Sequence, residues 1–187
     1  MIRKFTLSTL FAAALVLGAC SGSDSTSAGD FNDADVTFAQ EMIPHHRQAV
    51  EMSDLAATRS TDPDILALAD EIIAAQDPEI ALMTGWLDDW DEDVPGDMGD
   101  MSGMDHGGDG QMAGMMSPEQ MSDLRGSTGP EFDRLFLEQM IEHHEGALEM
   151  AVREQSDGRF TDAIALAQEI ERTQMAEIAR MKDLLAS

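Results

Sequence analysis

The chain is poor in the residues that usually hold small secreted proteins together. Its 187 residues include no tyrosine, two tryptophans, seven phenylalanines and one cysteine, Cys20. A single cysteine excludes an intramolecular disulfide, so stability must come from a hydrophobic core, and the length suits one domain. The apolar residues are mainly Leu, Ile, Ala and Met, which favour helices over sheets.

Basic residues are also scarce. The chain has 11 Lys and Arg against 37 Asp and Glu, a formal net charge of −26. A field of this sign repels nucleic acid and anionic lipid headgroups and concentrates cations near the surface. The charge therefore excludes nucleic acid as a partner and is compatible with metal ions.

The only long apolar run lies at the N-terminus, over residues 7–17, and follows Arg3 and Lys4. It is shorter than the roughly 20 residues that span a bilayer, which is typical of a signal peptide. We therefore predict that residues 1–19 are a signal peptide and that the protein is exported.

Cys20 ends this apolar run, directly after Gly18 and Ala19, and the pattern resembles a bacterial lipobox. We expect Cys20 to be lipidated and residues 20–30, rich in Ser, Gly and Asp, to form a flexible tether. The protein would then be a lipoprotein anchored to a membrane and facing the periplasm or the cell exterior. The alternative is an ordinary signal peptide that is cleaved before an incidental thiol.

The sequence repeats itself at a fixed offset of 98 residues. Asp33–Leu87 aligns with Glu131–Leu185 without a gap, with 21 identities in 55 positions. Turn and capping residues predict two helices in each copy, joined by a short turn, with Thr161 or Asp162 capping the last helix; the predicted helices cover residues 33–59, 63–89, 130–155 and 161–186. Such hairpins are antiparallel and bury their apolar stripes against each other. The sequence predicts an all-α, ferritin-like four-helix bundle domain over residues 31–187, made of two repeated αα-hairpins at 31–89 and 130–187.

A different kind of segment, residues 90–129, separates the repeats. It is acidic and rich in glycine, and Ser117 to Gln120 form a capping box that predicts a short helix ending near residue 125. The rest has few bulky apolar residues and is predicted to be flexible. Its candidate metal ligands are Met98, Met101, Met104, His106, Met112, Met115 and Met116.

Four of the five histidines form two pairs at equivalent positions of the repeat, His45-His46 and His143-His144. On a helix, a residue three or four positions earlier lies on the same face. Met42 and Met140 have this spacing, and Met52 and Met150 lie about two turns further along. We expect the approximate two-fold relation to bring both clusters together.

Thioether sulfur and imidazole together favour copper, Cu(I) before Cu(II). The Met-x-x-Met spacing of the linker offers a second, loop-based capture site for the same ion. The alternatives are that the methionines are core residues and that the histidines are held by polar partners. The repeated residues Gln76, Glu79, Gln174 and Glu177 either orient the histidine rings or lie on the helix surface.

The residues Met42-Ile43-Pro44-His45-His46 and Met140-Ile141-Glu142-His143-His144 resemble the motif of domain-of-unknown-function family 305. The resemblance implies a ferritin-like four-helix protein, often secreted, in a family with periplasmic copper binders linked to copper tolerance. It also implies that the methionine and the two histidines of each motif contact metal. Arg47-Gln48 replaces the Glu145-Gly146 of the second copy, so the two halves need not bind equally.

The leading hypothesis is a copper-binding envelope lipoprotein that buffers or sequesters copper, or hands it to a partner protein, and is not an enzyme. A di-iron oxidase would need Glu-x-x-His motifs. The residues three positions before the four histidines are instead Met42, Ile43, Met140 and Ile141. A metal-free structural or interaction lipoprotein is the other alternative.

Overall fold

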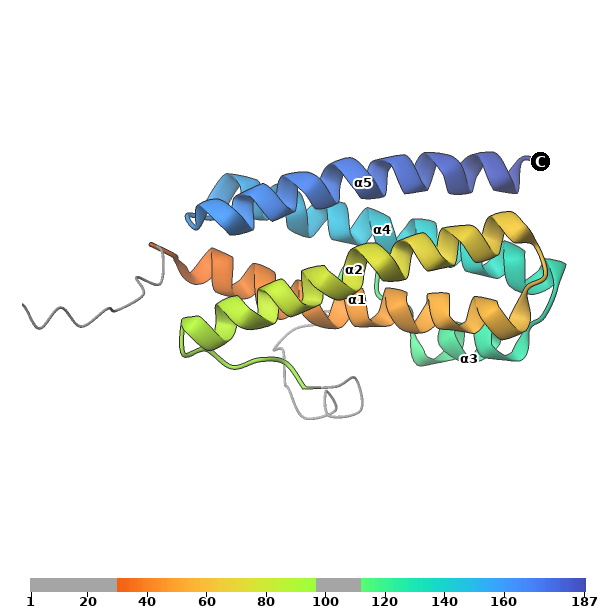
Figure 1. Ribbon diagram of the computed structural model, residues 1–187, viewed down its shortest axis with the longest axis horizontal. Coiled ribbons are helices and arrows are strands. Elements are labelled where there is room, and N and C mark those ends of the chain that lie inside the picture. The colour runs from red at the N-terminus through yellow and green to blue at the C-terminus, as the bar shows by residue number, and fades with distance from the viewer. Residues whose placement is uncertain (1–29, 97–111) are drawn as a thin grey trace, which may run out of the picture.

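The computed structural model describes residues 30–96 and 112–187, and this part of the chain is helical without strands. Its elements are α1 (Asp33–Arg59), α2 (Pro63–Asp89), the short α3 (Pro118–Gly126), α4 (Pro130–Asp157) and α5 (Thr161–Leu185). The four long helices form a bundle (Figure 1), in which α1 pairs with α2, α4 pairs with α5, and α1 packs on α4. The predicted all-α bundle of two repeated hairpins is confirmed.

Most helix ends follow their sequence signals. Asn32 caps α1 through the backbone N–H groups of Ala34 and Asp35, and Ser117 and Gln120 form the predicted capping box of α3. The predicted cap of the last helix is wrong, because Thr161 is already helical and the N-cap residue, Phe160, provides no side-chain bond.

A long-range contact fixes the turn that precedes α5. The buried Asp35 carboxylate accepts hydrogen bonds from the backbone N–H groups of Arg159 and Phe160, at 2.9 and 2.8 Å. The turn before α5 is therefore fixed from α1, a contact that no local sequence pattern indicates.

The core consists of two hydrophobic clusters along the bundle. One is built around Met52, Leu68, Phe132 and Phe136, and the other around Phe38, Ile43, Trp86 and Ile170. Their α1 and α4 residues lie on either side of the two histidine pairs in sequence. Since α1 and α4 run antiparallel, with Asn32 bonded to Asp157 and Arg59 to Gly129, the histidines lie between the clusters, in the middle of the bundle.

The described parts of the linker pack on the bundle more closely than the sequence predicts. Arg47 donates from Nη1 to the carbonyls of Pro95 and Gly96, at 2.7 and 2.9 Å, and Met116, Met121 and Leu124 are buried. The prediction of a flexible linker is therefore wrong for residues 112–117, since Met116 finds an apolar site between the helices. Within residues 30–96 and 112–187, no helix has the length and apolarity needed to cross a membrane.

Candidate metal centre

His45 of α1 and His143 of α4 meet where these two helices cross. Their ring centroids are 3.7 Å apart with the planes inclined by 38°, and both residues are buried. His144 is close to His143, with centroids 6.4 Å apart. The structure thus brings together the two pairs that lie 98 residues apart in sequence, and the four buried residues His45, His46, His143 and His144 are called the histidine layer below.

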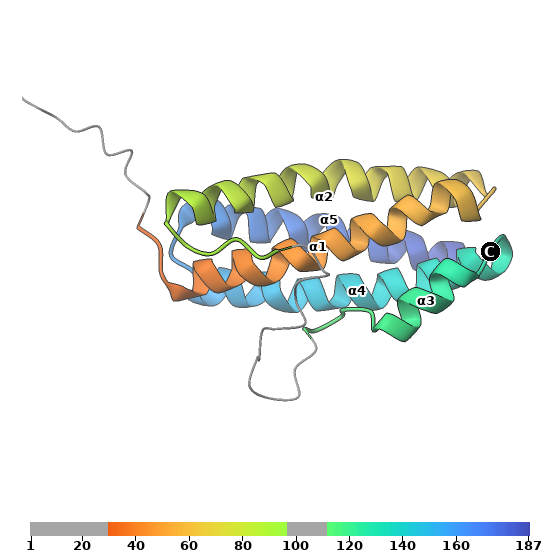
Figure 2. The same ribbon diagram turned by 90° about the horizontal axis from the view of Figure 1, so that it is seen from below.

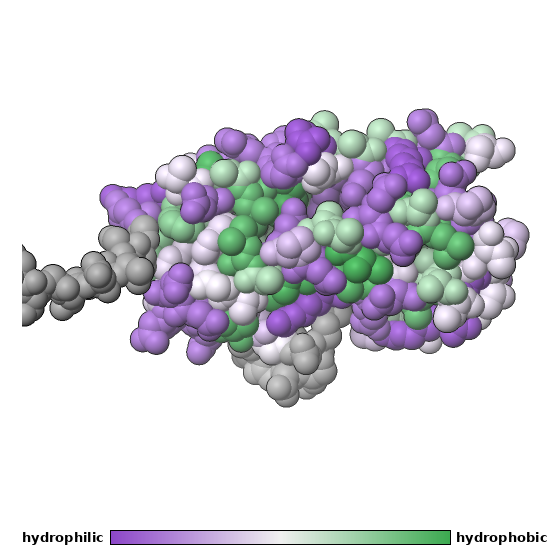
Figure 3. Space-filling model, in the orientation of Figure 1, coloured by the Kyte–Doolittle hydropathy of each residue, from purple (hydrophilic) through white to green (hydrophobic). Residues whose placement is uncertain are grey.

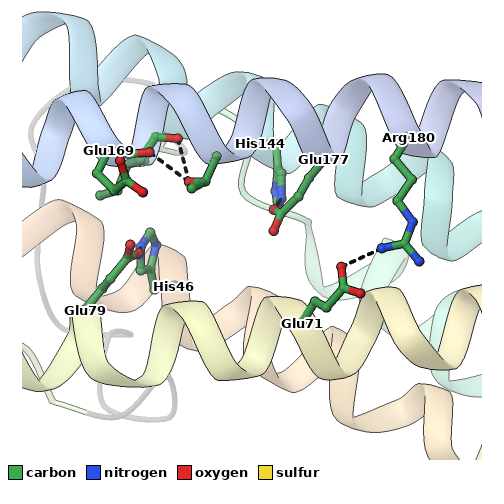
Figure 4. Close-up of polar contacts among 9 residues, drawn as sticks. His46, Glu71, Glu79, His144, Glu169, Glu177 and Arg180 are labelled. Atoms are coloured by element: carbon green, nitrogen blue, oxygen red, sulfur yellow. Dashed lines mark hydrogen bonds and ion pairs between the residues drawn. The ribbon is translucent and has the colours of Figure 1, made fainter.

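The outer histidines are each held by a carboxylate from the second helix of their own hairpin. Nε2 of His46 lies 2.7 Å from Oε2 of Glu79 on α2, and Nε2 of His144 lies 2.6 Å from Oε2 of Glu177 on α5. In Figure 4 the two pairs, His46 with Glu79 and His144 with Glu177, lie in the space between the ribbons of α2 and α5. A neutral imidazole that donates from Nε2 has its lone pair on Nδ1, so the glutamates fix which nitrogen can bind a metal.

Of the four repeated polar residues on the second helices, Glu79 and Glu177 orient histidines. Gln76 and Gln174 are buried, and the side-chain oxygen of each has no hydrogen-bond partner. The two glutamines therefore add unsatisfied acceptors to the bundle interior.

Burial keeps the inner histidines neutral. It lowers the pKa of His45 to about 3, with a further contribution from the neighbouring His46 and His144. Burial also lowers the pKa of His143 well below its usual value, with a smaller contribution from the neighbouring His45. A neutral imidazole keeps a lone pair, so His45 and His143 remain able to bind a metal across the whole physiological pH range.

The histidine layer has an unusual number of unsatisfied donors and acceptors. Both nitrogens of His45 and His143, and Nδ1 of His46 and His144, are buried without a well-formed hydrogen bond. The rings of His45 and His143 make only weak contacts with the backbone, of Ala113 and His45 respectively. Leaving a buried polar group unpaired costs about 1–3 kcal/mol, and native proteins rarely leave several together. Six nitrogens of this kind fit a site built to bind a cation.

The four helical methionines lie on either side of this layer. Met42 and Met150 are part of one core cluster, and Met52 and Met140 are part of the other. All four are buried. Each residue can thus serve as core packing and as a soft donor, and both interpretations of the sequence stay open for them.

The candidate ligands of the linker differ in whether the structure describes them and in how deeply they are buried. Met98, Met101, Met104 and His106 lie outside the described residues. Met112 and Met115 are partly buried, whereas Met116 is 4% exposed and packs in the cluster of Met52 and Met140. Met116 is therefore packed in the core and not in a flexible loop, and its role as a ligand stays a prediction. Cys20 also lies outside the described residues.

Within the described part of the chain, neither carboxylates nor the outer histidines complete a metal site around the inner pair. Among the described residues, no group of three or more His, Cys, Asp or Glu side chains is arranged to hold a metal ion. The inner rings of His45 and His143 would need thioether sulfur to complete a coordination shell, which favours a soft ion over Fe or Ca²⁺.

Sequence reasoning missed a buried acid pair at one end of the bundle. Glu154 on α4 is 1% exposed, and burial together with Asp35 raises its pKa to about 8. It borders a groove of about 280 Å³ that is also lined by Asp33, Glu41 and Met150. Glu154 has no counterpart in the repeat, since Ala56 stands at that position, so no pattern indicated it.

The chain matches the family model described as Domain of unknown function (DUF305) over residues 35–185. It is similar to the crystal structure of a DUF305 protein from Streptomyces coelicolor, assigned as secreted, with 34% identity, a TM-score of 0.73, and coverage of 82% of this chain and 92% of the other. It is also similar to CopM in a Cu(II)-bound form, with 34% identity, a TM-score of 0.68, and coverage of 81% and 95%.

A shorter similarity, 42% identity over 55 residues, links it to an uncharacterised protein of Acanthamoeba polyphaga mimivirus. The match spans 29% of this chain and 36% of the viral protein. The family model, in contrast, covers most of the chain and both helical hairpins. The protein belongs to the DUF305 family.

Proposed function

We propose that the protein binds copper in the histidine layer, and that this layer is the basis of a buffering, sequestering or transfer role. The observation that carries the proposal is the set of six imidazole nitrogens without a well-formed hydrogen bond, buried between methionine-containing clusters. Thioether and imidazole donors suit Cu(I), and imidazole also suits Cu(II). The similar protein CopM, solved in Cu(II)-bound and Cu(I)-bound forms, supports the choice of ion.

We further propose that the protein acts outside the cytoplasm, with Cys20 as a lipid anchor. The apolar N-terminal run and the position of the only cysteine support this, as does the similarity to a protein assigned as secreted. We propose no catalytic role, because the Glu-x-x-His pattern of di-iron enzymes is missing at all four histidines.

A metal-free structural role is the second candidate. The His46–Glu79 and His144–Glu177 contacts favour it, because they satisfy one nitrogen of each outer ring without a metal. The two candidates predict different effects when the inner pair is replaced by apolar rings. Under the structural role nothing but stability changes, whereas under the copper role the bound metal is lost.

The test is Cu(I) stoichiometry, measured by competition with a chromogenic Cu(I) chelator. Three proteins are compared: the mature chain, a variant with His45→Phe and His143→Phe, and a deletion of residues 98–111. The deletion stops before Met112, because Met116 is needed in the core. We expect the tightest copper to be lost from the double variant and kept by the deletion. Full retention of copper by the double variant would overturn the proposal.

A further inference from the structure

The end of the linker crosses the histidine layer on the side formed by α1 and α4. The residues Met112–Met116, called the strap below, precede α3 and run over this side of the bundle (Figure 2). The contacts of the strap are made mainly by its backbone. Two residues of the bundle, Gln48 on α1 and Gly146 on α4, create them.

Gly146 lets the strap approach α4 directly. A Cβ atom at residue 146 would overlap the carbonyl of Ala113 and lie 2.7 Å from Cα of Gly114. The contact is reciprocal, since a Cβ at residue 114 would lie 2.8 Å from the carbonyl oxygen of His143. Gly114 also has φ of +76°, which side chains disfavour. Only glycine at both positions allows the two backbones to touch beside His143.

Gln48 fixes the other end of the strap. Its Nε2 donates to the Met116 carbonyl at 3.0 Å, and its Oε1 accepts from the Met116 N–H at 2.7 Å. Both bonds are buried, so one side chain satisfies both backbone groups of a buried residue. Losing a partner here would leave Met116 unsatisfied, at a cost that strongly favours the docked position.

Gln48 and Gly146 occupy equivalent positions of the repeat, 98 residues apart and two residues after each histidine pair. The repeat therefore breaks at the two positions that contact the strap, and each break has a physical reason. A glutamine in α4 would collide with Ala113, and a glycine in α1 would leave Met116 without its partners. The strap covers one side of a nearly symmetric centre.

The strap also lies next to the inner rings. The Ala113 backbone contacts the ring of His45. This contact raises the pKa of His45 and so partly offsets the lowering caused by burial. The segment is five residues long and is held at Gln48, at Gly146 and by the buried side chain of Met116, whereas each bundle helix is held along its whole length. Opening this short segment breaks fewer contacts than separating two bundle helices, so it is the route by which the layer can be exposed from this side.

We propose that the strap controls access to the His45–His143 pair, and that Gln48 and Gly146 are the positioning residues that keep it closed. Its part in copper loading and release rests on the proposed function. Control of access itself does not, since any small reagent that reaches the rings from this side must pass the same segment.

The first experiment uses the metal-free mature protein and diethyl pyrocarbonate, which modifies accessible neutral imidazoles. The rates at His45 and His143 are measured by peptide mass spectrometry in Gln48→Ala and Gly146→Ala. Matched controls are Gln139→Ala, which removes a glutamine bonded to the carbonyl of Gln120, and Gly85→Ala, a helical glycine with open space around it. Circular dichroism confirms that each variant is folded.

We expect modification to be at least tenfold faster in both strap variants, a change equivalent to about 1.4 kcal/mol, and unchanged in the controls. Gln48→Glu keeps the acceptor and loses the donor, so its rate should lie in between. Folded strap variants that react at control rates would overturn the proposal. Gln48→Glu decides the question alone if either of the others fails to fold.

The second experiment follows Cu(I) transfer from loaded protein to excess chelator. Faster transfer in the strap variants, with unchanged stoichiometry, extends the control of access to copper. Transfer at the wild-type rate would refute this extension. If the wild-type protein bound no copper while the strap variants were modified faster, the proposed copper function would be wrong. The control of access by the strap would still be supported.

Discussion

His144 on α4 and Glu177 on α5 are joined by a contact of 2.6 Å between Nε2 and Oε2. The ring is fully buried, while the glutamate side chain is 17% exposed. The carboxylate therefore reaches inward from the α2–α5 side of the bundle. Figure 3 views this α2–α5 face and shows apolar residues among hydrophilic ones. Because the same contact recurs at His46, each hairpin orients its own outer histidine.

Removing such a carboxylate should weaken copper binding without touching a ligand. For Glu177→Ala we expect a loss of about 10–100-fold in Cu(I) affinity, because the ring of His144 loses the partner that fixes its tautomer and orientation. Chelator competition measures the change. Glu169→Ala is the control, since Glu169 lies on the same helix and pairs only with the exposed Arg172. Equal affinities in the two variants would show that Glu177 has no orienting role.

Neutral inner histidines should make the metal-free protein sensitive to acid. The pKa of His45 is lowered to about 3 and that of His143 is also lowered. Below about pH 6.5 the unfolded chain takes up protons that the folded chain does not, so folding stability falls as the pH falls. We expect about 1.4 kcal/mol per pH unit for each histidine.

Urea unfolding at pH 7, 6 and 5 checks this effect, with the His45→Phe and His143→Phe double variant as the reference. The wild-type protein should lose stability relative to this variant at each step towards acid. Parallel pH profiles would mean that the inner rings already titrate normally in the folded protein.

Glu154 should give the opposite dependence on pH. Its folded pKa of about 8 lies above the ordinary value of 4.5, chiefly through burial and then through Asp35. The stability that the protonated form contributes is complete below pH 4.5 and is lost as the pH rises towards 8. Glu154→Gln keeps a neutral amide there, so we expect it to stabilise the protein at pH 8 by roughly 2 kcal/mol.

The measurement is urea unfolding at pH 6 and pH 8. Glu149→Gln serves as the matched change, since Glu149 is an exposed residue of the same helix. A gain at pH 8 that is equal in both variants would assign the effect to net charge rather than to the buried Asp35–Glu154 pair.

Met116 and Met112 should separate a core role from a surface role within the strap. Met116→Ala removes a buried side chain and should cost about 2–5 kcal/mol in the free energy of unfolding. Met112 is only partly buried, so Met112→Ala should cost less than about 1 kcal/mol. Thermal unfolding of the two variants compares them, and equal losses would contradict the packing of Met116 in the core.

Much of the fold could be predicted from the sequence, because the repeat and the caps are local signals. Asn32, Pro63 and Pro130 mark helix starts that the structure places within a residue or two. The anchoring of the turn before α5 could not be predicted, since Asp35 is 124 residues away from Arg159 in the sequence. The docking of Met116 was missed for the same reason, as composition describes a segment and not the surface beneath it.

The candidate site was predictable to a similar extent. The pairing of histidines and methionines within one helix turn is a property of spacing, and the repeat implied that the two clusters would come together. Which polar residues hold the rings depends on how α2 and α5 are rotated, so Glu79 and Gln76 could not be told apart. The difference between Gln48 and Gly146, at equivalent positions of the repeat, was visible in the sequence. Its physical reason became clear only from the contacts of these residues with the strap.

The central claim is that imidazole nitrogen and thioether sulfur bind the same copper ion between α1 and α4. X-ray absorption at the copper K-edge of the mature protein, loaded with one equivalent of Cu(I) after deletion of residues 98–111, tests it most directly. The account predicts a first shell of both nitrogen and sulfur, with the imidazole contribution lost in the His45→Phe and His143→Phe variant. A shell of oxygen and nitrogen alone, unchanged in that variant, would contradict it.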